Sequence, residues 1–316
     1  ILRWLAAHRP DVVIASPYIV PRTVEIDYVQ AACALDLPTI AIVLSWDNLT
    51  TKGTFHIVPD AVLVWNDVLV KEAMAFHDVP HDKLLVTGAP VFDFWFEMQP
   101  TMDYPSFCKK VGINTDQPYV LYLCSSKYIS GDETAFVKQF AKTLGSGGNT
   151  QKIKVMVRPH PLNSEIWDGV EDEIIAVWPR SASWVDTPQA KQDYYHSIYH
   201  SRAVIGINTS AIIEAAILDR PCVTIVDEEY KFKQNGKGHF GHLIKAGFME
   251  ITHSFAESAE VIAAILTGKD SKKKQRHRFV SDFIRPRGLD RPASEILATA
   301  IEAAALRKDI QQLTFK

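Results

Sequence analysis

The chain has 316 residues and lacks both a long apolar run and a strong net charge. No apolar stretch approaches the roughly 20 residues that a membrane-spanning helix needs. Lys and Arg together number 34, Asp and Glu together number 37, and the formal net charge is therefore -3. A charge balance this close to zero gives no case for general nucleic-acid binding.

Cysteine is also scarce, and two common phosphate-binding motifs are missing. The four cysteines are Cys33, Cys108, Cys124 and Cys222, and none of them forms a CxxC pair. Three lie in apolar surroundings typical of buried thiols, so we expect a reducing compartment and no zinc site. The sequence has neither a P-loop nor a Gly-x-Gly-x-x-Gly motif after a predicted strand, which excludes these two nucleotide-binding fingerprints.

The sequence does have the composition and the alternation of a soluble α/β protein. Apolar residues make up 47% and charged residues 22%, a normal balance for a chain that forms one large domain or two ordinary ones. Short apolar runs alternate with amphipathic stretches, which predicts parallel sheets flanked by helices. Predicted strands cover residues 11–16, 39–45, 60–65, 84–87, 119–124, 154–158, 174–177, 204–207, 222–226 and 248–251. Predicted helices cover residues 24–37, 67–77, 132–144 and 190–200, the start of a helix after 210, and segments from 254 onward.

A proline-rich stretch interrupts the alternation between residues 90 and 118. Proline blocks both helix interiors and regular strand pairing, so this stretch predicts a connection between two lobes. Two doubly wound sheets joined in this way form a cleft, and ligands in such sheets bind outside the carboxyl ends of the strands. The residues that follow each predicted strand are therefore the candidates for ligand binding.

The stretch from Ala203 to Val226 predicts a strand, a short polar loop, a helix and a second strand with almost nothing between them. Such a helix start points unpaired N–H groups and a partial positive charge over the sheet edge, where phosphate binds readily. The loop is Asn208, Thr209 and Ser210, and Glu214 in the first helical turn is placed to reach a sugar or ribose hydroxyl. The alternative is an ordinary βαβ unit in which Ser210 is the N-cap and Glu214 favours the dipole.

Polar residues follow three other predicted strands. They are Trp46, Asp47 and Lys52, then Ser125, Ser126 and Lys127, then Arg158 and His160. The prolines on both sides of His160 stiffen the strand exit and fix its direction. A lone histidine at a strand end is more often structural than catalytic, but four polar loops at carboxyl ends together predict a ligand site.

Three further segments have both a functional and a plain interpretation. Residues 236–241 are glycine-rich, and Lys237 within them either meets an anion or belongs to a solvated turn. The acids at 227–229 either hold a divalent metal with substrate phosphates or form a hydrated turn that contacts a sugar hydroxyl; the function expected below needs no metal. The basic run at 272–278 is either a solvated helix face or a docking patch for anionic lipid.

These loops, in this order, resemble the GT-B glycosyltransferase-like superfamily, and within it the CDP-glycerol glycerophosphotransferases that build teichoic-acid-type and capsular polymers. The resemblance covers roughly residues 39–232 and rests on the order and spacing of short motifs. The UDP-N-acetylglucosamine 2-epimerases share this architecture and are close relatives. The matching motifs are Trp46-Asp47-Asn48 with Lys52, Gly88-Ala89-Pro90-Val91-Phe92-Asp93, Leu121 to Lys127, Arg158-Pro159-His160-Pro161, Ile207 to Ser210 with Glu214, Leu218 to Pro221, and Asp227 to Tyr230.

The resemblance implies a GT-B-type fold of two Rossmann-like, doubly wound parallel-sheet lobes. The acceptor-side lobe covers residues 1–100 and the nucleotide-donor lobe covers 101–290. The C-terminal helix, in residues 291–316, crosses back onto the first lobe. Because the chain begins with Ile1 rather than Met, we expect the first lobe to lack its first strand or two.

The resemblance also implies a transferase that moves a sugar or polyol phosphate from a CDP- or UDP-linked donor to a hydroxyl of a surface glycan or teichoic-acid-like polymer, without a cofactor. It implies a cytoplasmic enzyme, with peripheral contact at the anionic inner face of the plasma membrane as an option. The implied donor-binding residues are Ser125, Ser126, Lys127, Arg158, Asn208, Thr209, Ser210 and Glu214. In this scheme His160, with Arg158, neutralises the leaving diphosphate. Trp46 and Lys52 lie on the acceptor side.

One departure from the family pattern bears on the chemistry. The family has Trp-His-Gly where this chain has Trp46-Asp47-Asn48, and the family's histidine looks like the general base. A carboxylate can take a hydroxyl proton if the cleft raises its pKa or if proton loss is late, so we expect Asp47 to be the base and the acceptor or donor to differ. Two alternatives remain open. One is a nucleotide-sugar epimerase that uses Asp47 with Asp227 or Glu228, and the other is a non-catalytic two-lobed module that binds a nucleotide sugar or glycan.

Overall fold

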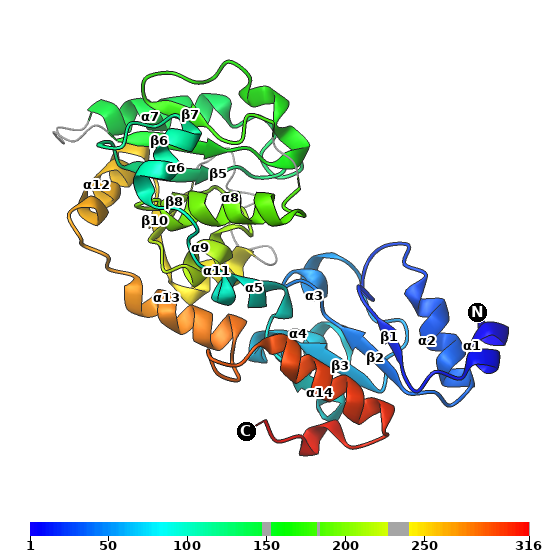
Figure 1. Cartoon of the computed structure of the whole chain (residues 1–316). Coiled ribbons are helices and arrows are strands. Elements are labelled where there is room, and N and C mark those ends of the chain that lie inside the picture. The colour runs from blue at the N-terminus through cyan, green and yellow to red at the C-terminus, as the bar shows by residue number, and fades with distance from the viewer. Residues whose placement is uncertain (147–152, 182–183, 227–239, 316) are drawn as a thin grey trace. The chain divides into compact units, whose positions relative to one another are not determined.

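The computed structural model describes residues 1–146, 153–181, 184–226 and 240–315. The chain divides into two compact units, which are described separately here (Figure 1). Unit 1 comprises Ile1–Phe94 and Phe279–Lys316, and unit 2 comprises Trp95–Arg278. Unit 1 is thus made from two distant segments of the chain, whereas unit 2 is one continuous segment.

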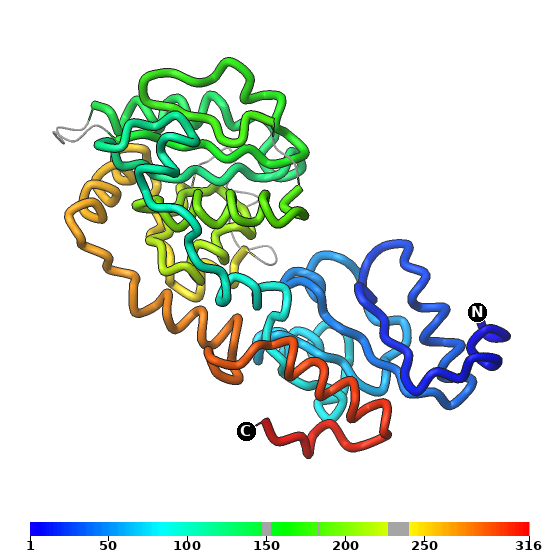
Figure 2. The backbone as a smooth tube through the Cα atoms, in the orientation of Figure 1, coloured from blue at the N-terminus to red at the C-terminus, as the bar shows by residue number. Residues whose placement is uncertain are grey.

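Unit 1 is built on a four-stranded parallel sheet. Its strands are β1 (Val13–Ala15), β2 (Thr39–Ile42), β3 (Ala61–Val64) and β4 (Leu84–Val86), and they lie in chain order. Its helices are α1 (Leu2–His8), α2 (Glu25–Ala34), α3 (Asn48–Thr51), α4 (Asp67–His77) and α14 (Ala293–Ala305). Every residue of β3 is buried, as expected for a parallel sheet covered on both faces. Ala300 and Ala304 of α14 join Ile40 and Leu63 in the core, so the C-terminal helix forms part of unit 1 (Figure 2).

The element from Gly88 to Asp93 fastens α14 to the rest of unit 1. A Cβ atom on Gly88, which has a φ of 87°, would lie 2.9 Å from the Ala293 Cβ and 3.0 Å from the Ile284 carbonyl oxygen, so only glycine fits there. The buried Asp93 carboxylate accepts the N–H groups of Ala293 at 3.0 Å and Ser294 at 2.7 Å. Its Oδ1 also pairs with Arg285 at 2.8 Å. The first N–H groups of α14 are therefore satisfied by a side chain about 200 residues earlier in the chain.

Unit 2 is built on a six-stranded sheet whose strands are all parallel. Its strands are β5 (Tyr119–Leu123), β6 (Lys154–Arg158), β7 (Ile175–Val177), β8 (Val204–Ile205), β9 (Cys222–Ile225) and β10 (Met249–Thr252). Its main helices are α6 (Tyr104–Val111), α7 (Thr134–Ser146), α8 (Pro188–Tyr199), α9 (Ile212–Ile217), α11 (Phe240–Ala246) and α12 (Phe255–Leu266). Two more helices, α5 (Asp93–Glu97) and α13 (Lys273–Phe279), lie where the chain passes between the units.

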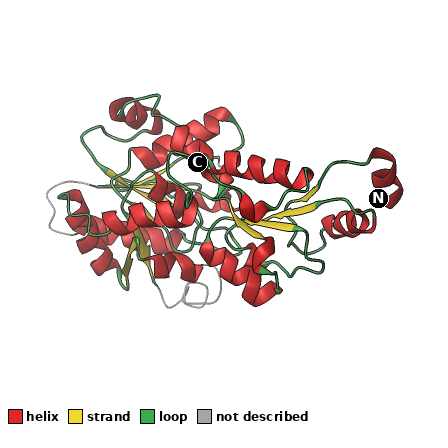
Figure 3. Ribbon diagram, turned by 90° about the horizontal axis from the view of Figure 1, so that it is seen from below, coloured by secondary structure: helices red, strands yellow, loops and turns green. Residues whose placement is uncertain are grey.

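The strand order β10-β9-β8-β5-β6-β7 makes unit 2 doubly wound. The chain starts at the central β5, runs outward through β6 and β7, and then returns to the other side of β5 for the remaining strands. Helices cover both faces of this sheet (Figure 3): α7 and α12 join the core on the face of Val120, whereas α8 accepts the hydroxyl of Tyr119 from the opposite face. The switch point between β5 and β8 is where such sheets bind ligands. The predicted fold class is confirmed.

Several element boundaries differ from the prediction for local reasons. The helix predicted over residues 24–37 ends at Ala34, because the chain turns at Asp36, which has a φ of 53°. The helix predicted over residues 190–200 begins earlier, at Pro188, because the Thr187 hydroxyl accepts the Ala190 N–H as an N-cap. No helix within the described ranges has the length and the apolar character to cross a membrane.

Candidate functional site

The polar loops of unit 2 meet at one edge of its sheet. Since β8, β5 and β6 are parallel neighbours in that order, their carboxyl ends lie side by side. Residues 208–210 and 125–127 follow β8 and β5, and residues 158–160 comprise the last residue of β6 and the start of the loop after it (Figure 1). The residues predicted to bind the donor therefore converge at the switch-point edge, where ligands of doubly wound sheets are found.

The loop after β8 is held close to β5. A Cβ atom on Gly206 would lie 2.7 Å from Thr209 Cγ2 and 3.2 Å from the Leu123 carbonyl oxygen, so glycine permits this approach. Thr209 Oγ1 accepts the Ala211 N–H at 3.3 Å, and Ser210 is exposed at the edge. The interpretation of Ser210 as the N-cap is wrong, because α9 begins at Ile212 and its N-cap position is Ala211. Because α9 has only six residues, its dipole attracts an anion less strongly than the dipole of a long helix would. The hydroxyl groups of the loop must therefore supply more of the binding to an anion.

Glu214 on α9 is half-buried, and its carboxyl group includes a buried oxygen, Oε2. Its Oε2 has no hydrogen-bond partner among the described residues, and burial raises its pKa from 4.5 to about 7. A buried acceptor without a donor is costly. The site therefore favours a ligand hydroxyl that donates to this oxygen.

A buried cation and a tyrosine accompany Glu214. The Arg158 guanidinium lies 4.5 Å from the centre of the Tyr194 ring on α8 and donates to Ser197 Oγ at 3.3 Å. Burial lowers the Arg158 pKa to about 10, so the side chain still carries its charge at neutral pH. Burial also raises the pKa of Tyr194, and the neighbouring Glu214 carboxylate raises it further while Arg158 lowers it. Side chains from β6, α8 and α9 thus form one polar cluster.

His160 is held in one neutral form. Its Nδ1 accepts the Leu162 N–H at 3.1 Å, which places the proton on Nε2. Burial lowers the pKa of the imidazole below its usual 6.5, so the ring is uncharged at neutral pH. The ring also makes an edge contact with Trp184, with centroids 6.0 Å apart. His160 is therefore set up to donate one hydrogen bond from Nε2 rather than to act as a cation.

The loop after β5 has an inward and an outward part. Ser125 is buried, and its N–H donates to the carboxylate of buried Glu133 at 3.2 Å. Ser126 is half-buried and Lys127 is exposed, so these two residues remain accessible to a ligand. Asn163, on the turn after His160, donates through Nδ2 to the Gly131 carbonyl at 2.5 Å. Asn163 thus joins the loop after β6 to the loop after β5, whereas Glu133 holds Ser125 within the loop after β5.

Sequence reasoning missed Glu133 and Asn163. An acid just before a helix is usually a solvated group that favours the dipole, and nothing local marks Glu133 as buried. Burial is the principal cause that raises the pKa of Glu133, and the hydrogen bond from the Ser125 N–H opposes this increase. The only available signal was that Glu133 follows a polar loop at a strand end.

The polar loop of unit 1 follows β2 and centres on Asp47. Its Oδ1 accepts the Ser45 hydroxyl at 2.6 Å, and its Oδ2 lies 3.2 Å from Lys52 Nζ. Trp46 is only 3% exposed. Asp47 and Lys52 therefore act as an ion pair at the start and end of the short helix α3.

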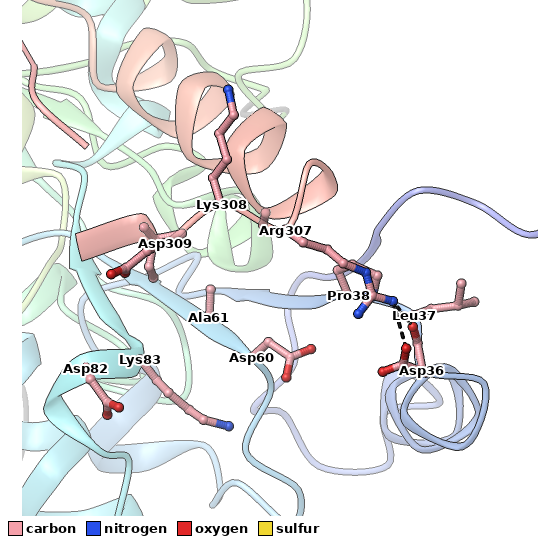
Figure 4. Close-up of a pocket in the computed structure, with 12 residues that line it drawn as sticks. Asp36, Leu37, Pro38, Asp60, Ala61, Asp82, Lys83, Arg307, Lys308 and Asp309 are labelled. Carbon is pink, nitrogen blue, oxygen red and sulfur yellow. Dashed lines mark hydrogen bonds and ion pairs between the residues drawn. The ribbon is translucent and has the colours of Figure 1, made fainter. Parts of the chain in front are cut away.

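A separate hollow of about 380 Å³ lies at the opposite edge of the unit 1 sheet (Figure 4). Pro38, Asp60 and Lys83 line it just before β2, β3 and β4, respectively. Arg307 reaches across it to Asp36 at 3.1 Å. Because it lies at the amino ends of the strands, this hollow is not at the edge where α/β sheets bind ligands.

The sequence matches the family of CDP-Glycerol:Poly(glycerophosphate) glycerophosphotransferases over residues 56–301, which is most of the chain. The chain belongs to this family. It is therefore a transferase of the kind that uses a nucleotide-diphosphate-activated donor, as the motifs predicted. No protein of curated function matches this sequence.

The fold of the chain is similar to several solved structures. A putative UDP-N-acetylglucosamine 2-epimerase from Listeria monocytogenes has a TM-score of 0.63 at 14% identity, covering 98% of this chain and 77% of its own. S. aureus MnaA in complex with UDP has a TM-score of 0.60 at 13% identity, covering 96% and 78%. A variant of the wall teichoic acid polymerase TagF with CDPG has a TM-score of 0.52 at 14% identity, covering 78% and 57%. At these identities the likeness shows the GT-B-like fold alone.

The departure from the family's Trp-His-Gly pattern has a local structural explanation at its third position. Asn48 is buried, and its Oδ1 accepts the Ser45 N–H at 2.9 Å. The asparagine side chain therefore closes the turn that a glycine would leave open. The acid Asp47 lies within that turn.

Some of the predicted segments are outside the described residues. They are the acids Asp227, Glu228 and Glu229 with Tyr230, and the glycine-rich loop with Lys237. Within the described ranges, no group of three or more His, Cys, Asp or Glu side chains could hold a metal ion.

The basic run at residues 272–278 is less uniform than its sequence suggests. Arg276 has a fully buried side chain that pairs with Asp219 and Asp270, both at 2.6 Å. Lys273 and Lys274 are exposed on the same helix, α13. The interpretation of the whole run as one solvated face or one patch is therefore wrong at Arg276, which anchors α13 to the turn after α9.

Proposed function

We propose that this chain transfers glycerol phosphate from CDP-glycerol to a hydroxyl of a surface glycan or teichoic-acid-like polymer. Family membership supports the reaction class. The observation that carries the proposal is the convergence of three polar loops at the switch-point edge of unit 2, with buried Arg158 and the unpartnered Glu214 oxygen beside them.

The donor's phosphates bind at the switch-point edge. Hydroxyls and N–H groups of Thr209 and Ser210 hold them, and Ser126 and Lys127 contribute from the loop after β5. Asn208 shapes the loop. The Glu214 carboxylate accepts hydrogen bonds from ribose hydroxyls, which satisfies its unpartnered Oε2.

The acceptor side provides the base. Asp47 takes the proton of the acceptor hydroxyl, and Lys52 places the acceptor, with Trp46 supporting the loop. The acceptor oxygen then bonds to the glycerol-bearing phosphorus while the bond to the bridging oxygen breaks, and CMP leaves. Arg158 and the Nε2–H of His160 stabilise the charge that grows on the phosphate oxygens, an interaction that strengthens in the transition state.

The products of the reaction distinguish transfer of glycerol phosphate from the alternative functions. Incubation with CDP-glycerol and a set of UDP- and GDP-sugars should release CMP, and only when an acceptor is present. Sugar transfer would instead release a nucleoside diphosphate, and an epimerase would isomerise the sugar without an acceptor. Tight binding without turnover would indicate a binding module and would overturn the proposal.

We also propose a cytoplasmic location with peripheral contact at the anionic inner face of the plasma membrane. The exposed Lys273 and Lys274 on α13 support this, since each cation near such a surface contributes about 1 kcal/mol. Sedimentation with vesicles that contain or lack phosphatidylserine tests it. Equal recovery with both vesicle types would contradict the contact.

A further inference from the structure

Unit 1 has a small cavity of about 230 Å³ that no motif predicted. It lies between the loop that follows β1 and the segment after α3, which is the carboxyl edge of the unit 1 sheet. Arg22, Lys52 and His56 line it, together with the hydroxyl-bearing residues Thr23 and Thr54. None of the described residues that line it is acidic.

The basic groups in this cavity are available to a ligand. Lys52 pairs with Asp47 at 3.2 Å while its side chain is 44% exposed. Neither Arg22 nor His56 has a hydrogen bond or ion pair within the described part of the chain. Three nitrogen-bearing side chains facing a concave surface without a carboxylate make a site for an anion.

Two features indicate a built site. Arg22 has a φ of 63°, a conformation that costs a bulky residue energy and that is concentrated at functional sites. Tyr18 is buried at the cavity, and its hydroxyl donates to the Ile57 carbonyl at 2.8 Å, which ties the two walls together. These constraints hold the loop with Arg22 against the segment with His56.

The size of the cavity limits what it can bind. Sites that enclose a whole small ligand measure about 300–1,000 Å³, and this cavity is smaller. It therefore suits one charged group of a longer molecule. Through the Lys52–Asp47 ion pair, that group would lie next to the proposed base.

We infer that this cavity is an anion subsite that binds a phosphate of the acceptor next to the hydroxyl that reacts. This inference rests on the proposed function and adds to it a position in unit 1 for a phosphate of the acceptor. Arg22 and His56 hold the phosphate oxygens, and Lys52 bridges this subsite to Asp47.

The test compares three probes on the full chain by calorimetric titration: inorganic phosphate, glycerol 3-phosphate and glycerol. We expect glycerol 3-phosphate to bind more tightly than inorganic phosphate, and glycerol not to bind. Arg22→Asn should weaken the binding of glycerol 3-phosphate by about 10-fold, the loss of one charge-assisted hydrogen bond. Asparagine tolerates the positive φ of this position, so the backbone should be kept. His56→Gln is the second variant, and Arg3→Gln, an exposed arginine of α1, is the matched control.

Each other outcome overturns the inference. If glycerol binds as tightly as glycerol 3-phosphate, the cavity does not recognise the phosphate and is not an anion subsite. Inorganic phosphate bound as tightly as glycerol 3-phosphate would indicate a site for free anions and not for the acceptor. If both Arg22→Asn and His56→Gln bind glycerol 3-phosphate with unchanged affinity, the cavity is not where this ligand binds. Titration of CDP-glycerol into the same samples reports on the donor site separately, so a failure of the proposed function is distinguished from a failure of this subsite.

Discussion

His160 has a defined tautomer, with its proton on Nε2 because Nδ1 accepts the Leu162 N–H. If this proton stabilises the phosphate oxygens of the leaving group, His160→Ala should lower kcat by about 100-fold or more. The affinity for CDP-glycerol should change much less, because the interaction strengthens in the transition state. Steady-state kinetics with CMP release as readout measure both quantities. His253→Ala, an exposed histidine of unit 2, is the control, and unchanged kcat in His160→Ala would exclude it from the mechanism.

Asp47 differs from the histidine of the family pattern, so its role needs a direct test. Asp47→Asn keeps the size of the side chain and its hydrogen bond from Ser45 but cannot take a proton. Donor affinity should remain and transfer should be abolished, as measured by calorimetry and by CMP release. Asp11→Asn, an exposed aspartate of unit 1, is the control. Full transfer activity in Asp47→Asn would reduce Asp47 to a structural residue.

Glu214 predicts a pH dependence of stability. Burial raises its pKa from 4.5 to about 7, so the folded state holds the proton more tightly than the unfolded state. The stabilisation from this proton is complete below about pH 4.5 and is lost as the pH rises to about 7. Glu214→Gln is neutral at every pH, so its free energy of unfolding relative to the wild type should rise by up to about 3 kcal/mol between pH 4.5 and 8.

Urea unfolding at several pH values measures this difference. Glu165→Gln, an exposed glutamate of unit 2, should give a curve parallel to that of the wild type. If the curve for Glu214→Gln is also parallel to that of the wild type, the pKa of the Glu214 carboxyl group is not raised in the folded state.

Residue types at strand ends could be predicted, but burial within a loop could not. Ser125, Ser126 and Lys127 are consecutive polar residues, and the sequence gives no reason to treat them differently. The structure turns Ser125 inward because its N–H satisfies the buried Glu133 carboxylate. Such a contact depends on where α7 begins in space, which local sequence does not encode.

At the scale of elements, the attachment of α14 depends on Asp93. Asp93→Ala would remove the acceptor for two N–H groups of α14 and leave Arg285 buried without this partner. We expect a loss of about 3 kcal/mol or more in the free energy of unfolding, measured by urea denaturation. Asp290→Ala, an exposed aspartate close to α14 in sequence, should cost far less. Similar losses in both variants would contradict this role of the Gly88–Asp93 element.

The helices and strands were predictable where periodicity was strong, and their ends were not. The short apolar runs correspond to parallel strands because both faces of those strands are buried. The start of α9 was misplaced because Ser210 has the chemistry of an N-cap while the chain continues in a turn to Ala211. The position of β8 beside β5 depends on long-range pairing, which the local sequence patterns do not predict.

At the scale of the whole molecule, donor binding should stabilise the fold. CDP-glycerol at 100 times its dissociation constant should add about 2.7 kcal/mol to the stability of the state that binds it. For a unit the size of unit 2 this corresponds to a rise of about 5–10 °C in Tm. Differential scanning calorimetry with CDP-glycerol, and with glycerol as the control, measures it. No shift in Tm and no heat on titration would mean that the switch-point edge does not bind a diphosphate.

The division of the chain also has a consequence for its synthesis. Unit 2 is one continuous segment. Unit 1, in contrast, needs residues 279–316 to cover its sheet and to donate hydrogen bonds to the Asp93 carboxylate. During translation, Trp95–Arg278 therefore emerges in full from the ribosome before residues 279–316 do. At that stage the core of unit 1 is incomplete, because Ile40 and Leu63 pack with Ala300 and Ala304 of α14. Unit 2 is therefore able to fold first during translation, and unit 1 stays open to chaperones and proteases until α14 leaves the exit tunnel.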